Sequence, residues 1–335
     1  MSEVKTKHIE SRELGLASVR EAERSLSRQA LTRSDILSVY RVAEFVTLAR
    51  DASPVCWPLF PDFERGRLIF STGYVYPTKA HNAQRNPRVA ALYSDPTASG
   101  RSDEDPSVLV QGLAEVFDQD LQRNTERYVD QFFRKGPTPF RVMLRIPRLR
   151  QLLVGYLTRI WIEVIPRQEY VWARTEVPPE PLQRARRPDS FSPAPGIKLP
   201  DDVFEWLPRY ARLPVLSYID NAGWPAIIRT RAKVRRDRIE IESDIEMSEG
   251  APACLTYHRL VGNYRANDAF IVRGHFNTAG CMIPERVVGY GGTRDDRGVG
   301  SAKLMRMLFG FRKQLARQLE KEGRPMPVVR RTPGA

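Results

Sequence analysis

The chain of 335 residues contains only three cysteines and four histidines. The cysteines, Cys56, Cys254 and Cys281, lie far apart, and an odd number of them does not fit a disulfide framework. The sequence has no Cys-x-x-Cys and no His-x-x-x-His pair, the short spacings with which proteins commonly hold zinc. These scarcities argue against a metal centre and against a disulfide-rich secreted domain.

Long hydrophobic runs are also missing. A membrane-spanning helix needs roughly 18 or more consecutive apolar residues. The segment that comes closest, residues 151–165, is interrupted by Arg159 and Glu163. Residues 1–24 are charged and lack the apolar block of a secretory signal. We therefore expect no transmembrane segment and a cytoplasmic location.

Acidic residues are outnumbered by basic ones, 40 against 53, which gives a formal net charge of +13. Such a surface attracts nucleic acid, anionic lipid and small anions. Much of the excess lies in two arginine-rich stretches, residues 123–167 and 303–331. Aromatic residues are not interleaved there as base-stacking platforms require, so we expect no nucleic-acid partner. A solvated basic surface and a specific site for a small anion are both open.

A pattern of strand, turn and strand occurs twice in the sequence. The spacing from Pro54 to Thr72 is the same as the spacing from Pro225 to Ser243. The order of apolar and polar residues is also similar in the two segments. A shared spacing of this kind indicates that one small β-module was duplicated. A site is therefore expected within one copy or between the two, which predicts either an intrachain pseudo-dimer or a homodimer.

Composition and periodicity divide the chain into four parts. These are a polar N-terminal arm (1–34), a first β-domain (35–175), a linker rich in proline and arginine (176–203), and a second β-domain that ends in a basic helix (204–335). Six short strands with few helices predict a small barrel in each domain. Because a small barrel has little interior volume, a sizeable ligand must bind outside it, beside the strands or between the barrels.

One segment of the first copy has the chemistry of a phosphate site. A predicted strand ends in Ser71 and Thr72, Gly73 follows, and Lys79 stands at the start of a short predicted helix. Hydroxyls, free backbone N–H groups and an ammonium group together bind phosphate well. A polar turn with a solvated lysine is the alternative interpretation.

The same segment resembles the signature of the flavin-binding split-barrel superfamily, which includes pyridoxamine 5'-phosphate oxidases and flavin/deazaflavin oxidoreductases. In that family a strand ending in Ser-Thr is followed by a lysine and, seven or eight positions later, by Asn-Pro, as in Lys79 to Asn86-Pro87. The resemblance covers residues 36–175. Residues 204–292 share the pattern of strands but not the residues of the phosphate site. It implies a mainly β fold with peripheral helices, built as two tandem split β-barrels.

The resemblance also implies which residues bind the cofactor. Ser71, Thr72, Lys79 and Asn82 would hold its phosphate, with Trp57 and Pro58 near its ring system. FMN is the expected cofactor and the deazaflavin coenzyme F-420 is the alternative. Pro77 replaces an arginine that many members carry, and the substrate-binding arginine and histidine motif of pyridoxamine phosphate oxidases is not evident. Oxidation of vitamin B6 is therefore not expected.

The second copy has lost the elements of such a site. Gly250 stands where the lysine would be, and Glu242, Glu246 and Glu249 would repel a phosphate. The sequence thus predicts one cofactor site and a flavin- or deazaflavin-dependent oxidoreductase that transfers hydride to or from a small molecule. No catalytic residue is named, because the cofactor supplies the reactivity. The alternative is a non-catalytic cofactor-binding protein for sensing, storage or carriage.

Overall fold

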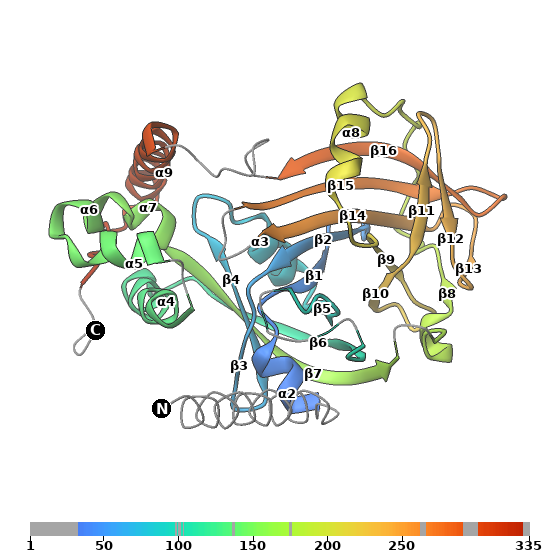
Figure 1. The fold of residues 1–335 in the computed structure, drawn as a ribbon, viewed down its shortest axis with the longest axis horizontal. Coiled ribbons are helices and arrows are strands. Elements are labelled where there is room, and N and C mark those ends of the chain that lie inside the picture. The colour runs from blue at the N-terminus through green and yellow to red at the C-terminus, as the bar shows by residue number, and fades with distance from the viewer. Residues whose placement is uncertain are drawn as a thin grey trace, which may run out of the picture.

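The structure is a computed structural model. The residues it describes are 33–97, 99, 102, 104–135, 138–173, 176–261, 266–290 and 301–330. Nearly all of the predicted N-terminal arm, up to residue 32, lies outside this part of the chain. Two curled antiparallel sheets make up the centre of the molecule, and a group of helices lies to one side (Figure 1).

The first sheet has seven strands in the order β2-β1-β5-β6-β7-β4-β3. Their bounds are β1 (Ala43–Leu48), β2 (Pro54–Leu59), β3 (Asp62–Glu64), β4 (Arg67–Gly73), β5 (Arg88–Tyr93), β6 (Ser107–Phe117) and β7 (Arg159–Trp172). All six residues of β1 are buried. Alternate side chains of a strand point to opposite faces, so β1 is covered on both. Phe45 stacks on Phe70 of β4, and Glu44 on the other face contacts the second copy.

The second sheet has seven strands in the order β10-β9-β14-β15-β16-β12-β11. Their bounds are β9 (Val215–Ile219), β10 (Pro225–Arg229), β11 (Arg231–Val234), β12 (Ile239–Glu242), β14 (Pro252–Val261), β15 (Ala266–Phe276) and β16 (Cys281–Tyr290). Numbered within each copy, both orders read 2-1-5-6-7-4-3. The two copies therefore share one topology, and the prediction of a mainly β fold with two tandem split barrels is confirmed.

Two details of strand number and length differ from the sequence prediction. Each sheet has seven strands and not six, because β3 and β11 are separate edge strands. The repeat predicts one strand after Pro225, whereas the structure has two there, β10 and β11, which meet at Thr230. The Thr230 hydroxyl donates a hydrogen bond to the carbonyl of Glu242, which turns the chain at that point.

A glycine bulge recurs at the same place in both copies. The pairing register shifts at Gly112 on β6 and at Gly274 on β15. A Cβ atom would lie 2.5 Å from the carbonyl oxygen of Ile165 at the first position and 1.9 Å from that of Ile283 at the second. Only glycine allows the neighbouring strand to come this close, so the bulge is inherited by both copies.

The first copy carries a helical insertion that the second lacks. Between β6 and β7 lie α4 (Leu121–Lys135), α5 (Thr138–Arg145), α6 (Pro147–Leu152) and α7 (Val154–Leu157), whereas residues 277–280 alone connect β15 to β16. We call α4–α7, together with α9 (Ser301–Lys321), the helical lobe. The remaining helices of the described residues are α2 (Arg33–Val39), α3 (Thr78–Arg85) and α8 (Asp201–Trp206), with short 3-10 turns at Glu180–Leu182 and Leu207–Arg209.

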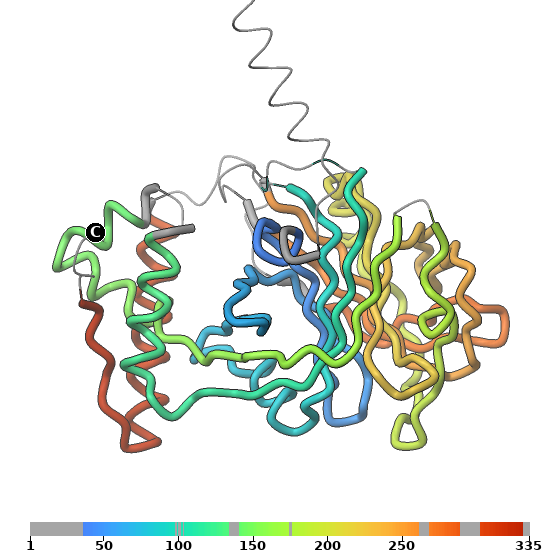
Figure 2. Tube along the Cα trace, turned by 90° about the horizontal axis from the view of Figure 1, so that it is seen from below, coloured from blue at the N-terminus to red at the C-terminus, as the bar shows by residue number. Residues whose placement is uncertain are grey.

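Helix α9 follows the second copy in sequence but packs on the first. In Figure 2 it lies alongside the helices of the insertion, on the far side of the first sheet from the second copy. A Cβ atom on Gly155 of α7 would lie 2.4 Å from the backbone of Phe311 and Arg312, so the two helices touch at this glycine. The amide of Gln314 also donates to the carbonyl of Val75, 3.0 Å away.

The proline- and arginine-rich linker is ordered along the second sheet. Its strand β8 (Arg184–Ala185) pairs with β13 (Glu246–Met247), and Arg184 forms an ion pair with Glu246 at 2.5 Å. Further along, the backbone N–H of Ile197 donates to the carbonyl of Pro284 at 2.7 Å. These contacts bind the linker to the second copy. No helix within the described ranges combines the length and apolarity needed to cross a membrane.

The two copies face each other through a pseudo-twofold exchange of contacts. The amide of Gln111 on β6 donates to the Asp220 carboxylate at 2.8 Å, and Arg273 on β15 lies 3.5 Å from the Asp51 carboxylate. Gln111 and Arg273 precede the two bulge glycines, while Asp51 and Asp220 lie in the turns that follow β1 and β9. Reciprocal contacts between corresponding parts of two copies are the mark of an isologous interface, here formed within one chain.

Candidate functional site

Lys79 is a buried lysine near the start of α3. Its side chain is only 7% exposed, and its Nζ lies 4.7 Å from the centre of the Trp57 ring. Burial, and then the nearby positive charge of Arg159, lowers the pKa of Lys79 from 10.5 to about 8. At pH 7 about nine-tenths of Lys79 is still protonated. The chain therefore holds a cation in a site that disfavours one.

Arg159 stands beside Lys79 and was missed by the sequence analysis. Pairing of β4 with β7 puts it opposite Gly73. Its guanidinium lies 4.3 Å from the centre of the Tyr128 ring and 4.5 Å from that of Tyr156, and it donates to the Tyr128 hydroxyl at 3.0 Å. The two rings hold the guanidinium in one orientation. No local pattern in the sequence marks Arg159 as a site residue, because its place there depends on the pairing of β7 with β4.

The predicted phosphate ligands do not all converge. Thr72 is buried and its hydroxyl donates to the carbonyl of Tyr76 at 3.0 Å. Ser71 and Thr72 are consecutive on β4 and point to opposite faces. Ser71, which is half-buried, shares its face with Gly73 and is a diagonal neighbour of Arg159 across the β4–β7 ladder. We call the surroundings of Lys79 and Arg159 the Lys79 corner; Ser71 points to the same face of β4 as Arg159 does on β7, whereas Thr72 points to the other face.

Asn82 and Pro58 have other surroundings. The Asn82 amide donates to the Thr47 hydroxyl at 3.1 Å and accepts from Arg85 at 2.6 Å, so it ties α3 to β1. Trp57 and Pro58 are consecutive on β2 and point to opposite faces. Pro58 lies in register with Glu44, whose side chain contacts the second copy. Of the predicted site residues, the structure brings Trp57 and Lys79 into direct contact.

The corresponding corner of the second copy is filled by the linker. Gly250 has a φ of +71°, and a Cβ atom there would lie 3.1 Å from the side chain of Arg187. The guanidinium of Arg187 donates in turn to the carbonyl of Phe191 at 3.2 Å. The second copy therefore has linker chain where the first has the Lys79 ammonium.

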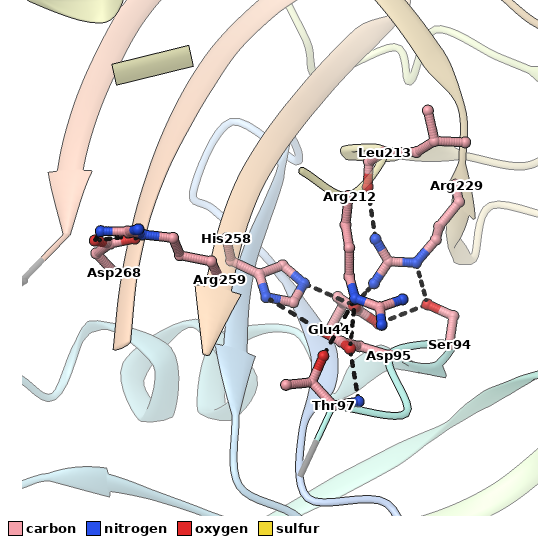
Figure 3. Close-up of polar contacts among 10 residues, drawn as sticks. All are labelled: Glu44, Ser94, Asp95, Thr97, Arg212, Leu213, Arg229, His258, Arg259 and Asp268. Carbon is pink, nitrogen blue, oxygen red and sulfur yellow. Dashed lines mark hydrogen bonds and ion pairs between the residues drawn. The ribbon is translucent and has the colours of Figure 1, made fainter. Parts of the chain in front are cut away.

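A buried polar cluster joins the two copies near this region (Figure 3). The Glu44 carboxylate, fully buried on β1, contacts Arg229 and lies 2.8 Å from Nε2 of His258. Arg229 donates to the Ser94 hydroxyl at 2.8 Å, and Asp95 forms an ion pair with Arg212. Because its carboxylates are paired and shielded from solvent, the cluster fastens the interface. Among the described residues no group of histidine, cysteine and acidic side chains is arranged to hold a metal ion.

Comparison with known proteins gives likenesses of structure only. No family model matches the sequence, and no curated protein matches it. One similar solved structure is an F420 reductase, with 19% sequence identity, a match that covers 41% of this chain and 93% of that one, and a TM-score of 0.30. Another is a conserved hypothetical protein from Mycobacterium tuberculosis, with 19% identity, coverage of 44% of this chain and 89% of that one, and a TM-score of 0.32. A third is a FAD-binding protein from Mesorhizobium loti, with 18% identity, coverage of 41% of this chain and 86% of that one, and a TM-score of 0.28.

Identities and TM-scores this low carry no argument about activity or cofactor, and the fold assignment rests on the strand order itself. Seven antiparallel strands in the order 2-1-5-6-7-4-3 occur twice, with a glycine bulge at the same place in each. The chain is thus a tandem of two split β-barrels, the fold of the flavin-binding split-barrel superfamily that its sequence resembles.

Proposed function

We propose that this protein binds one flavin-type cofactor at the Lys79 corner of the first barrel and acts as an oxidoreductase on a small molecule. The observation that carries the proposal is that a buried cation, Lys79, lies close enough to a half-buried cation, Arg159, for the second charge to lower the pKa of the first. Like charges in such a place repel each other and lose hydration. An anion between them would reverse both costs.

The residues of the corner fit the phosphate of a flavin. Lys79 would supply a point charge, and Arg159, held between Tyr128 and Tyr156, would supply a fixed fork of N–H donors. The half-buried Ser71 hydroxyl adds a donor on the same face as Arg159. Trp57, which carries the Lys79 ammonium over its ring, would lie against the bound cofactor.

FMN is the preferred cofactor and coenzyme F-420 the alternative. The basic charge of the chain suits the polyanionic tail of F-420. Against F-420, position 77 is a proline, where many members of the superfamily have an arginine. When bound, either cofactor supplies hydride chemistry from its ring. The residues of this chain bind and orient the phosphate, and the ion pair of Glu44 with Arg229 joins the second barrel to the first.

The second candidate function is a non-catalytic carrier or sensor of the cofactor. This function is favoured by the difference between the two copies. In the second copy, Arg187 of the linker packs against Gly250, the position that corresponds to Lys79. Both proposals place the cofactor at the same site. They differ in whether the bound cofactor reacts with a substrate.

The absorption spectrum of the purified protein, followed by titration with FMN and with F-420, tests the proposal. We expect one cofactor per chain. Lys79→Ala should weaken binding about tenfold or more, as loss of a hydrogen bond to a charged group does. Lys233→Ala, at an exposed lysine of the second barrel, is the matched control. A protein that takes up neither cofactor contradicts the proposal, whereas a bound cofactor that no donor reduces favours the carrier.

A further inference from the structure

A cavity lies on the first barrel, outside the Lys79 corner. It has a volume of about 770 Å³ and is enclosed by the β3–β4 hairpin, the end of β6 and the first turns of α4. This volume falls within the range of roughly 300–1,000 Å³ that is usual for small-molecule sites. None of the predicted cofactor ligands lines it. The second copy has no counterpart, because α4 belongs to the helical insertion.

The cavity and the Lys79 corner lie on one face of β4 but are separate. Arg67 and Ile69 point into the cavity, while Ser71 and Gly73 follow on the same face at the corner. Ile69 and Gly73 are about 13 Å apart along the strand. Trp161, buried and in register with Ser71, fills the space between them beneath Arg127.

The floor of the cavity is apolar. It consists of Ile69, which is buried, and Phe117, which is 44% exposed; strand pairing through β7 puts both side chains on the same face of the sheet. When an apolar ligand covers a phenyl ring that is in contact with water, the free energy of the complex falls because apolar surface is buried. The floor therefore suits a compact aromatic or aliphatic body.

The inner wall of the cavity is charged but internally paired. Glu163 joins two arginines, since it lies 2.9 Å from Arg127 and 3.5 Å from Arg67. Arg67 also pairs with Glu115, and Arg127 with Glu64. These guanidinium groups are satisfied by carboxylates, so the inner wall has little charge left for a ligand.

The two remaining arginines of the cavity have no such partners. Arg65, at the tip of the β3–β4 hairpin, and Arg123, in the first turn of α4, are exposed. Neither guanidinium has an acidic partner within the described part of the chain. The one other carboxylate of the lining, Asp120, accepts the backbone N–H of Arg123 at 2.9 Å. Two guanidinium groups thus stand at the rim above an apolar floor.

We infer that this cavity is a second binding site, which takes an amphipathic organic anion: a compact apolar body with one carboxylate, sulfonate or phosphate group. The body lies on Ile69 and Phe117, and Arg65 and Arg123 pair with the acidic group. Guanidinium groups bind such oxyanions in a bidentate manner. The site stands whether or not a flavin binds at Lys79.

The test uses the fluorescent dye anilinonaphthalene sulfonate, which has an apolar body and one anionic group. We expect the full-length protein to bind one dye per chain at the cavity. Arg65→Gln and Arg123→Gln should each weaken binding about tenfold, because each removes a charged hydrogen-bond donor. Arg231→Gln, at an exposed arginine of the second barrel, should have no effect. Phenylnaphthylamine, the neutral counterpart of the dye, should bind at least tenfold more weakly.

A second measurement places the dye without any variant. Hydrogen exchange should slow on binding in residues 62–69 and 115–128, and not in residues 74–86 around Lys79. Lys79→Ala should leave dye affinity unchanged, so a failure of the flavin proposal does not affect this one. Dye affinity that is equal in Arg65→Gln, Arg123→Gln and wild type, or protection confined to other segments, overturns the inference.

Discussion

Replacing Lys79 by methionine should stabilise the protein while it weakens binding of the cofactor. The pKa of Lys79 is about 8 in the folded chain against 10.5 for an unhindered lysine. Each unit of this difference corresponds to about 1.4 kcal/mol, so the protonated side chain costs the folded state about 3 kcal/mol at pH 7. Methionine carries no charge and retains contact with the Trp57 ring.

The pH dependence gives the sign of the effect. Between pH 8 and 10.5 the folded lysine has released its proton while the unfolded lysine still holds one. Wild-type stability therefore rises with pH in this window, because the unfolded state binds more protons. Lys79→Met lacks this contribution. Its stability advantage should fall from about 3 kcal/mol at pH 7 to about 1 kcal/mol at pH 9.5, less a constant amount for the lost cation–π contact.

Urea denaturation of the cofactor-free protein at pH 7 and at pH 9.5, followed by tryptophan fluorescence and circular dichroism, measures this difference. Lys233→Met, at a lysine whose side chain is 57% exposed, is the control and should show no such trend. With saturating FMN the order should reverse, because the ligand stabilises only the chain that binds it. A stability difference that is the same at both pH values would refute the reasoning, since Lys79 would then not be a strained cation.

Three further variants concern the scaffold. Gly274→Ala should destabilise the protein by more than about 2 kcal/mol, because a Cβ atom would lie 1.9 Å from the carbonyl oxygen of Ile283. Gly310→Ala, inside α9 where no atom lies within 4 Å, should instead stabilise it by about 1 kcal/mol. Arg229→Met should cost about 3–5 kcal/mol, because it leaves the buried Glu44 carboxylate without its guanidinium partner.

Thermal and urea unfolding measure all three variants. Equal effects at Gly274 and Gly310 would show that backbone proximity at the bulge is not the cause. For Arg229→Met the companion variant is Glu44→Gln, which removes the charge that would otherwise stand alone. If the double variant is no more stable than Arg229→Met, the stranded carboxylate is not the source of the loss.

The sequence was most informative where local patterns repeat. The shared spacing from Pro54 and from Pro225 led to the tandem fold. The split at Thr230 was not predicted, because it depends on a hydrogen bond to Glu242 on another strand. Edge strands such as β3 are too short to show a period of two.

The candidate site was predictable only in part, for the same physical reason. Lys79 and Trp57 were identified from the resemblance, but their contact depends on how α3 packs over β2. Arg159 joins the corner through pairing of strands that are far apart in sequence, and no local pattern encodes such a partner. Nor does alternation reveal the face of Ser71 until the register of β4 is known.

The return of α9 to the first barrel has a consequence for the order of synthesis. The barrel and its insertion leave the ribosome first, yet Gly155 of α7 stays bare until Phe311 and Arg312 arrive to cover it. At common rates of 5–20 residues per second, the roughly 170 residues from α7 to the end of the described chain take about 10–30 s. During that interval the face of α7 that α9 later contacts is uncovered, so the nascent chain is most exposed to chaperones and proteases while its second barrel is being made.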